Sequence, residues 1–313
     1  MSFLFLFLDG VGLGAEDPAI NPLARATMPT VQGLLDGHRL TLPTAPWVGG
    51  QATLLALDAG LGVDGLPQSA TGQAVLLTGR NVPRELGYHY GPKPNQAVAE
   101  ILGGATIFAK AVKAGMSAAL LNAYPSRYFQ GIDSGKRLYS SFPLAVTNAG
   151  LRLFTKEDLH AGRALAADFT GHGWRRLLRD RSAPIMDEQA AGHRLAQVAA
   201  QHDLALFEYW ASDYAGHKQD MQEAVQLLQS FDKVLGGLLE VWPPGEGLIL
   251  ITSDHGNMED LSTRRHTLAP VPALLIGPRQ AREVFSAGMK DLTGIEPAIW
   301  GYLSARAPVD TDL

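Results

Sequence analysis

Short apolar runs alternate along the chain with longer amphipathic segments. The runs Phe3–Leu8, Leu204–Phe207 and Leu248–Ile251 each predict a buried strand, because continuous apolar stretches of this length are typical of strands covered on both faces. Segments 187–201 and 221–240 have apolar residues at helical spacing and predict amphipathic helices. The alternation predicts an α/β fold with a mostly parallel central sheet and helices on both faces.

Metal-competent side chains follow all three of these strands. Asp9 comes directly after the first strand, Asp213 and His217 come shortly after the second, and Asp254 and His255 follow the third. In open α/β sheets, ligands bind in the crevice beyond the carboxyl ends of the strands. Carboxylate and imidazole groups at such an edge suit Zn²⁺ or Mn²⁺.

Two further residues extend this group. His266 follows the third strand after a short interval, and Ser69 lies in a polar stretch ahead of the apolar segment 74–77. Thr71 offers a second hydroxyl in that stretch, and we expect a helix to begin near Gly72. The amino end of a helix favours a bound anion. The pattern therefore combines a candidate nucleophile with candidate metal ligands.

The same motifs resemble the alkaline phosphatase superfamily. They comprise Asp-Gly after the first strand, a hydroxyl residue before a helix, Asp-x-x-x-His at 213–217, Ser-Asp-His-Gly-Asn at 253–257 and His-Thr…Val-Pro at 266–272. Within the superfamily they are most similar to cofactor-independent phosphoglycerate mutase and phosphopentomutase. The resemblance implies an alkaline phosphatase-like fold, two divalent metal ions (Mn²⁺ or Zn²⁺) and a small phosphorylated substrate.

The resemblance also implies a role for each candidate residue. It places one ion on Asp9, Ser69, Asp254 and His255, and the other on Asp213, His217 and His266. The family's nucleophile stands three residues before a Gly-His pair, which favours Ser69 over Thr71 because Gly72 follows Ser69 by three. The family's histidine is Gln73 in this chain, a departure that weakens the transfer of mutase-specific behaviour.

The alternation of strands and helices breaks between about residues 131 and 185. We expect residues 1–130 and 186–313 to form the metal-binding catalytic core, and residues 131–185 to form a small cap that contributes substrate specificity. Guanidinium groups in or near the cap could bind a substrate phosphate or carboxylate. The candidates are Arg127, Arg175 and Arg176.

Three functions are compatible with these residues. The short insert and Gln73 favour a phosphohydrolase, acting on a monoester or diester through a phosphoserine at Ser69. The alternative is a phosphomutase, which must exclude water while the phosphoserine exists. A second alternative is a non-catalytic metal-binding protein on the same scaffold.

The composition limits the classes of partner and of metal site that we expect for the chain. A net charge of −5, from 26 basic and 31 acidic residues, gives no broad attraction to nucleic acid. The absence of cysteine excludes thiolate metal sites and a cysteine-derived nucleophile. The opening apolar run lacks a basic start and is interrupted by Asp9, so we expect a core strand, no membrane association and a cytoplasmic location. The oligomeric state stays open.

Overall fold

A seven-stranded sheet, with strand order β2-β3-β9-β8-β1-β7-β4, forms the centre of the fold. The computed structural model describes residues 2–243, 245 and 247–305. The strands are β1 (Phe3–Leu8), β2 (Trp47–Val48), β3 (Ala52–Leu57), β4 (Ala118–Leu120), β7 (Leu204–Tyr209), β8 (Leu248–Thr252) and β9 (Val271–Ile276). Strands β3, β8, β1, β7 and β4 run in one direction, and β2 and β9 run in the other. The predicted mostly parallel α/β fold is confirmed.

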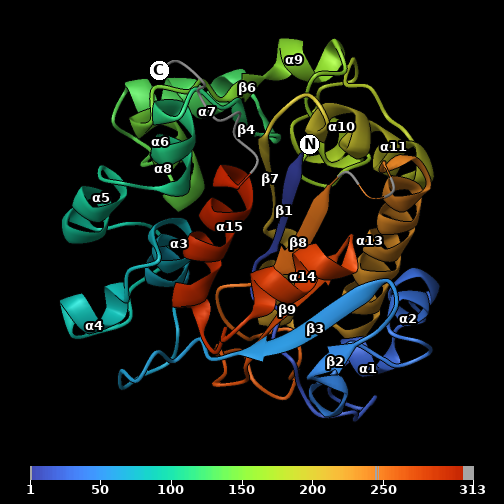
Figure 1. The fold of residues 1–313 in the computed structure, drawn as a ribbon. Helices are drawn as coiled ribbons and strands as arrows, with labels where there is room; N and C mark the ends of the chain where they lie inside the picture. Colours follow the sequence, from blue (N-terminus) through green and yellow to red (C-terminus); the bar gives the residue numbers. More distant parts are fainter. Residues whose placement is uncertain (1, 244, 246, 306–313) are drawn as a thin grey trace, which may run out of the picture.

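Helices cover both faces of this sheet (Figure 1). One layer contains α3 (Ser69–Thr78), α4 (Val82–Leu86), α5 (Gln96–Leu102), α6 (Ile107–Lys113), α8 (Ser141–Asn148), α14 (Arg279–Ser286) and α15 (Ile295–Ser304). The other contains α1 (Pro22–Arg25), α2 (Pro29–Leu34), α11 (Glu188–Ala199), α12 (Ala211–Lys218) and α13 (Met221–Val241). Short 3₁₀ turns lie at Leu42–Thr44 and Leu292–Gly294.

The side chains of β1 alternate between the two layers. Its phenylalanines enter the core beneath α3 and α8, while its leucines enter the core beneath α11 and α13. All six residues of the strand are buried. Burial of both faces explains why the strand is continuously apolar in sequence.

Most predicted elements lie where the sequence placed them, with two differences. Helix α3 begins at Ser69 rather than near Gly72, and every residue of the helix is buried. Since an all-buried helix needs no polar face, its sequence has little amphipathic periodicity to mark its start. Strand β3, which we did not predict, pairs with β9 in antiparallel register.

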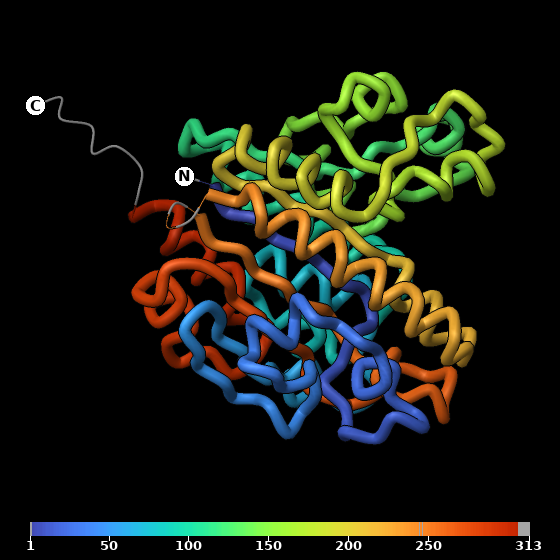
Figure 2. The backbone as a smooth tube through the Cα atoms, turned by 90° about the vertical axis from the view of Figure 1, so that its right-hand side faces the viewer, coloured from blue at the N-terminus to red at the C-terminus, as the bar shows by residue number. Residues whose placement is uncertain are grey.

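The segment 131–185 lies along the β4 edge of the sheet, and Figure 2 shows it, in green and yellow-green, at the opposite side from the blue β2–β3 edge. Here and just before it lie β5 (Ala123–Tyr124), α7 (Ser126–Asp133), β6 (Phe154–Thr155), α9 (Lys156–His160) and α10 (His172–Leu177). Part of the segment belongs to the core, because Phe142 of α8 packs on Phe7 with ring centroids 4.7 Å apart. Phe169 and Trp174 are buried in the other core. Its contribution to specificity stays a prediction.

Within residues 2–243, 245 and 247–305, no helix combines the length and apolar character that a membrane crossing requires.

Candidate metal centre

The topology brings all seven predicted site residues to one edge of the sheet. Strands β1, β7 and β8 are parallel and end together, so the residues that follow them meet there. Strand β9 runs the opposite way, so the segment with His266 that leads into it begins at the same edge. Strand β3 ends at this edge too, and the chain then leads to Ser69 as the first residue of α3.

One group of side chains surrounds the imidazole of His255, which is fully buried. Its Nε2 atom lies 3.0 Å from Ser69 Oγ, 3.4 Å from Asp9 Oδ1 and 3.7 Å from Asp254 Oδ1. Ligand atoms of Asp9, Asp213 and His255 all lie within 4.8 Å of one another. This spacing is compact enough for one ion.

A second group shares Asp213 with the first. Ligand atoms of Asp213, His217 and His266 lie within 4.8 Å of one another. Asp213 and His217 face the same direction because they are one turn apart on α12, with Oδ2 and Nε2 3.2 Å apart. The rings of His255 and His266 stack with centroids 3.7 Å apart, which places the two groups side by side.

Backbone carbonyls orient the three histidines. The Nδ1 atoms of His217 and His266 lie 2.7 Å from the carbonyl oxygens of Arg264 and Pro67. His255 Nδ1 lies 3.3 Å from the carbonyl oxygen of Gly256. A proton on Nδ1 satisfies each carbonyl and leaves Nε2 with its lone pair facing the centre, the arrangement that metal-binding histidines need.

The electrostatics of the centre require positive charge. Among the residues that the structure describes, no group hydrogen-bonds to the buried Oδ1 atoms of Asp9 and Asp213. Burial, followed by the charges of neighbouring carboxylates, raises the pKa of Asp9 well above its usual range. Burial also raises the pKa of Asp254 to about 6 and lowers the pKa of His255 to about 3. Buried carboxylates beside the neutral imidazole of His255 fit divalent cations.

The structure distinguishes the two candidate hydroxyls. Thr71 Oγ1 donates to the carbonyl oxygen of Gln68 at 3.1 Å and accepts from the Tyr90 backbone N–H at 3.1 Å. The Thr71 side chain is also fully buried. Ser69 Oγ instead faces His255 Nε2. The geometry therefore favours Ser69 as the nucleophile.

Gln73, which stands where the family has histidine, contacts two of the candidate metal-binding carboxylates. Its Nε2 donates to Asp254 Oδ2 at 3.2 Å and lies 3.5 Å from Asp9 Oδ2. Helix α3 approaches Asp254 closely because Gly72 has no side chain: a Cβ atom there would lie 2.9 Å from both Asp254 Cβ and the Asp254 carbonyl oxygen. Gln73 thus links two carboxylates of the centre, a contact that sequence spacing alone did not reveal.

Two buried glutamates near the centre were also missed. Glu259 accepts from the backbone N–H groups of Gly12 at 3.0 Å and Asn257 at 2.8 Å and from the Thr267 hydroxyl, which ties three ligand-bearing loops together. Glu208 is 7% exposed, and burial followed by the charge of Asp254 raises its pKa to about 7. In the sequence, Glu208 could have been recognised as the single acidic residue of an otherwise apolar strand.

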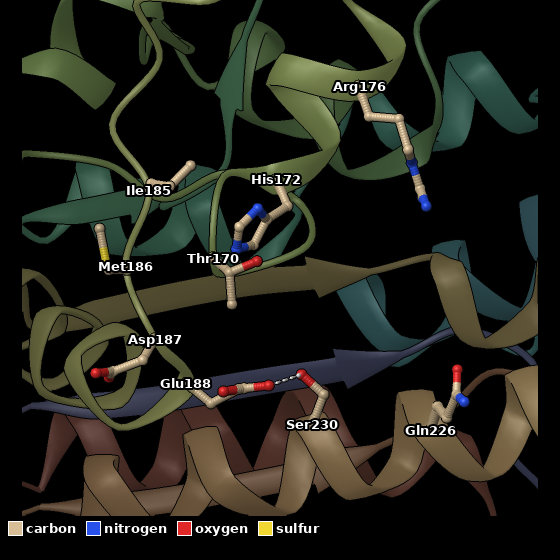
Figure 3. A pocket seen from close by; sticks show the side chains of 9 residues that line it. All are labelled: Thr170, His172, Arg176, Ile185, Met186, Asp187, Glu188, Gln226 and Ser230. Carbon is tan, nitrogen blue, oxygen red and sulfur yellow. Dashed lines mark hydrogen bonds between the residues drawn. The ribbon is translucent and has the colours of Figure 1, made fainter.

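The three predicted arginines belong to neither of these clusters, and Arg175 and Arg176 are consecutive residues of α10. Arg127 is exposed on α7, and Arg175 Nε donates to the carbonyl oxygen of Ala183 at 2.8 Å. Arg176 lines a cavity of about 740 Å³ between segment 170–187 and helices α11 and α13 (Figure 3). None of the seven candidate ligands lines this cavity, in which Glu188 and Ser230 face each other. Substrate binding by these arginines stays a prediction.

Known proteins resemble this chain in part of its sequence and in its fold. The family profile described as Metalloenzyme superfamily matches residues 181–307. A 2,3-bisphosphoglycerate-independent phosphoglycerate mutase of Dinoroseobacter shibae is 28% identical over 130 residues, which are 39% of this chain and 25% of the mutase. The chain thus spans about a quarter of the length of the curated relatives it matches.

Two solved structures share the fold over nearly the whole chain. The PH0037 protein of Pyrococcus horikoshii has a TM-score of 0.56 at 14% identity, covering 97% of this chain and 96% of that one. Alkaline phosphatase from the Antarctic bacterium TAB5 has a TM-score of 0.55 at 12% identity, with coverages of 96% and 97%.

The chain shares its fold with alkaline phosphatase, and side chains that could hold divalent ions meet at one edge of its sheet. Residues 181–307 are similar to the Metalloenzyme superfamily, and the curated relatives that the chain matches in part are named as phosphoglycerate mutases. They support the mutase alternative better than the hydrolase that the short insert led us to favour.

Proposed function

We propose that the chain is a two-metal phosphomutase that moves a phosphoryl group between two hydroxyls of one substrate through a phosphoserine at Ser69. Ser69 Oγ lies 3.0 Å from His255 Nε2 at the amino end of α3, and this single contact carries the nucleophile assignment. The names of the curated relatives support the mutase over the hydrolase. Ser69 is only 7% exposed, which fits a reaction that excludes water.

The seven candidate ligands form two sets, and Asp213 lies close to the ligand atoms of both. Asp9, Ser69, Asp254 and His255 would hold one ion, and Asp213, His217 and His266 the other. When bound, two divalent ions supply positive charge that stabilises the attacking and leaving oxygens of an in-line phosphoryl transfer. Mn²⁺ and Zn²⁺ both suit this mixture of oxygen and nitrogen donors.

The protein's own groups account for the remaining steps. Ser69 Oγ loses its proton and bonds to phosphorus while the ester P–O bond breaks, and the departing substrate oxygen takes up a proton. The backbone N–H groups at the start of α3 favour the anionic phosphoryl group. A second hydroxyl of the same substrate then attacks the phosphoserine, and Ser69 recovers its proton.

A phosphohydrolase is the second candidate, and Gln73 is the observation that favours it. The family's histidine is missing at this position, so mutase-specific behaviour transfers less directly to this chain. In a hydrolase, water replaces the second hydroxyl and inorganic phosphate is released.

A phosphate-release assay separates the two functions. We would load the protein with Mn²⁺ or Zn²⁺ and test p-nitrophenyl phosphate, its bis-ester, sugar phosphates and phosphoglycerates, with Ser69→Ala as the control. The proposal predicts Ser69-dependent movement of phosphate within one substrate, with little release. Ser69-dependent release without movement would replace the mutase with a hydrolase, and no turnover of either kind would favour a non-catalytic metal-binding protein.

A further inference from the structure

The cavity of about 740 Å³ between segment 170–187 and helices α11 and α13 lies outside the candidate metal centre (Figure 3). None of the seven candidate metal ligands lines it. Its volume falls within the range of small-molecule sites, about 300–1,000 Å³. Most of the side chains around it are polar, so hydrogen bonds and charge would decide which ligand it accepts.

Helix α10 supplies hydrogen-bond donors to one wall of this cavity. His172 and Arg176 both line the cavity, and they lie on the same face of α10 because they are four positions apart. Within residues 2–243, 245 and 247–305, no carboxylate pairs with Arg176. Its guanidinium is permanently charged, and its N–H donors match the oxygens of a phosphate or a carboxylate. In a chain with a net charge of −5, this unpaired cation gives one side of the cavity a local preference for an anion.

Acidic side chains line the opposite wall. Glu188 Oε1 accepts a hydrogen bond from Ser230 Oγ at 3.3 Å, and Figure 3 shows this pair on the other side of the cavity from Arg176. Asp187 also lines the cavity, but one of its carboxylate oxygens already accepts from the Ala190 backbone N–H at 2.7 Å. A carboxylate repels a second anion and accepts hydrogen bonds from hydroxyl groups. The two walls therefore favour different ends of one ligand.

We propose that this cavity is a second ligand site, separate from the candidate metal centre, and that it binds a polyol carrying one anionic group. Arg176 and His172 bind the anion, a phosphate or a carboxylate, through their N–H donors. The hydroxyls of the ligand donate to Glu188 and pair with the amide of Gln226. Such a ligand contacts both segment 170–187 and α13, and so links the insert to the core. The inference goes beyond the proposed function, because this binding requires neither Ser69 nor the metal ions.

Histidine signals in NMR can report this cavity separately from the metal centre. We would titrate isotope-labelled, Zn²⁺-loaded Ser69→Ala protein, which cannot form the proposed phosphoserine, and assign the His172 imidazole signal with His172→Gln. His172 reports the cavity, whereas His217, His255 and His266 report the metal centre. The probes are sorbitol phosphate, gluconate and uncharged sorbitol. We expect at least one anionic probe to shift the His172 signal with an affinity about tenfold or more above that of sorbitol, and the tighter one identifies the preferred anion.

Substitutions then assign the binding to the two walls. Arg176→Ala should weaken the anionic probe about tenfold or more at the His172 signal. Arg181→Ala is the matched control, because it removes an exposed arginine of the same segment that does not line the cavity, and it should keep the parental affinity. Phosphogluconate, which carries two anions, should bind more weakly than the better single-anion probe, and Glu188→Gln should remove this difference.

The inference would be overturned if no probe moved the His172 signal, or if Arg176→Ala and Arg181→Ala bound the anionic probe equally well. Both arginines are exposed, so thermal unfolding should show both variants to be as stable as the parent. Failure of the proposed phosphoryl transfer would show in the turnover assay and would leave the His172 titration unchanged.

Discussion

Replacing Glu208 with glutamine should change how the stability of the metal-free protein depends on pH. Burial, followed by the charge of Asp254, raises the pKa of Glu208 from 4.5 to about 7. The folded state therefore prefers the neutral carboxyl, and the difference corresponds to about 3 kcal/mol. A raised carboxyl pKa contributes stability that is present at low pH and is lost as the pH rises through about 7.

Glutamine at this position cannot ionise and so avoids this loss. Urea unfolding in chelator should show the free energy of unfolding of Glu208→Gln rising relative to the parent by about 3 kcal/mol between about pH 4.5 and about pH 8.5. Groups that do not interact with Glu208 titrate alike in both proteins and cancel in the difference. Glu100→Gln removes an exposed carboxylate of α5 and should give a nearly constant difference. If Glu208→Gln and the parent lose stability in parallel, then Glu208 is not the buried acid that the structure describes.

Four further predictions concern substitutions in and around the candidate metal centre. Gln73→Leu removes the amide that donates to Asp254 Oδ2 and should weaken metal binding about tenfold in a calorimetric titration. An unchanged metal affinity would show that this hydrogen bond does not orient the Asp254 carboxylate. Elemental analysis should find one ion per chain in His217→Ala and in His266→Ala, and excess metal should partly restore their activity. If a variant retains two ions, the histidine it lacks is not a metal ligand. Thr71→Ala should cost about 1–3 kcal/mol in thermal unfolding, because it leaves the Tyr90 backbone N–H unsatisfied, yet it should not abolish turnover. Gly72→Ala should destabilise the protein and lower its metal affinity, because the alanine Cβ would lie 2.9 Å from Asp254 Cβ. A variant with parental stability and metal affinity would contradict this close packing.

The sequence predicted those parts of the molecule that local patterns encode. The apolar strands β1 and β8 and the amphipathic helix α13 are continuous segments with clear periodicity, and the ligands follow the strands directly. The parallel topology then brings these ligands together, so their convergence could be inferred without coordinates.

The parts that sequence reasoning missed depend on contacts between distant segments. The Gln73 amide reaches Asp254 across 181 positions of the chain, and no spacing rule predicts that contact. Substrate binding by Arg127, Arg175 and Arg176 stays a prediction, because a basic run indicates charge but not the direction in which it faces.

We propose that Ser69 accepts a phosphoryl group from a phosphate monoester at a two-metal centre. Mass spectrometry tests this proposal on metal-loaded protein that is quenched in acid during turnover and digested to peptides. We expect one added phosphoryl group on Ser69, absent from Ser69→Ala and present in Thr71→Ala. A phosphoryl group on Thr71, or turnover by Ser69→Ala at the parental rate, would contradict it.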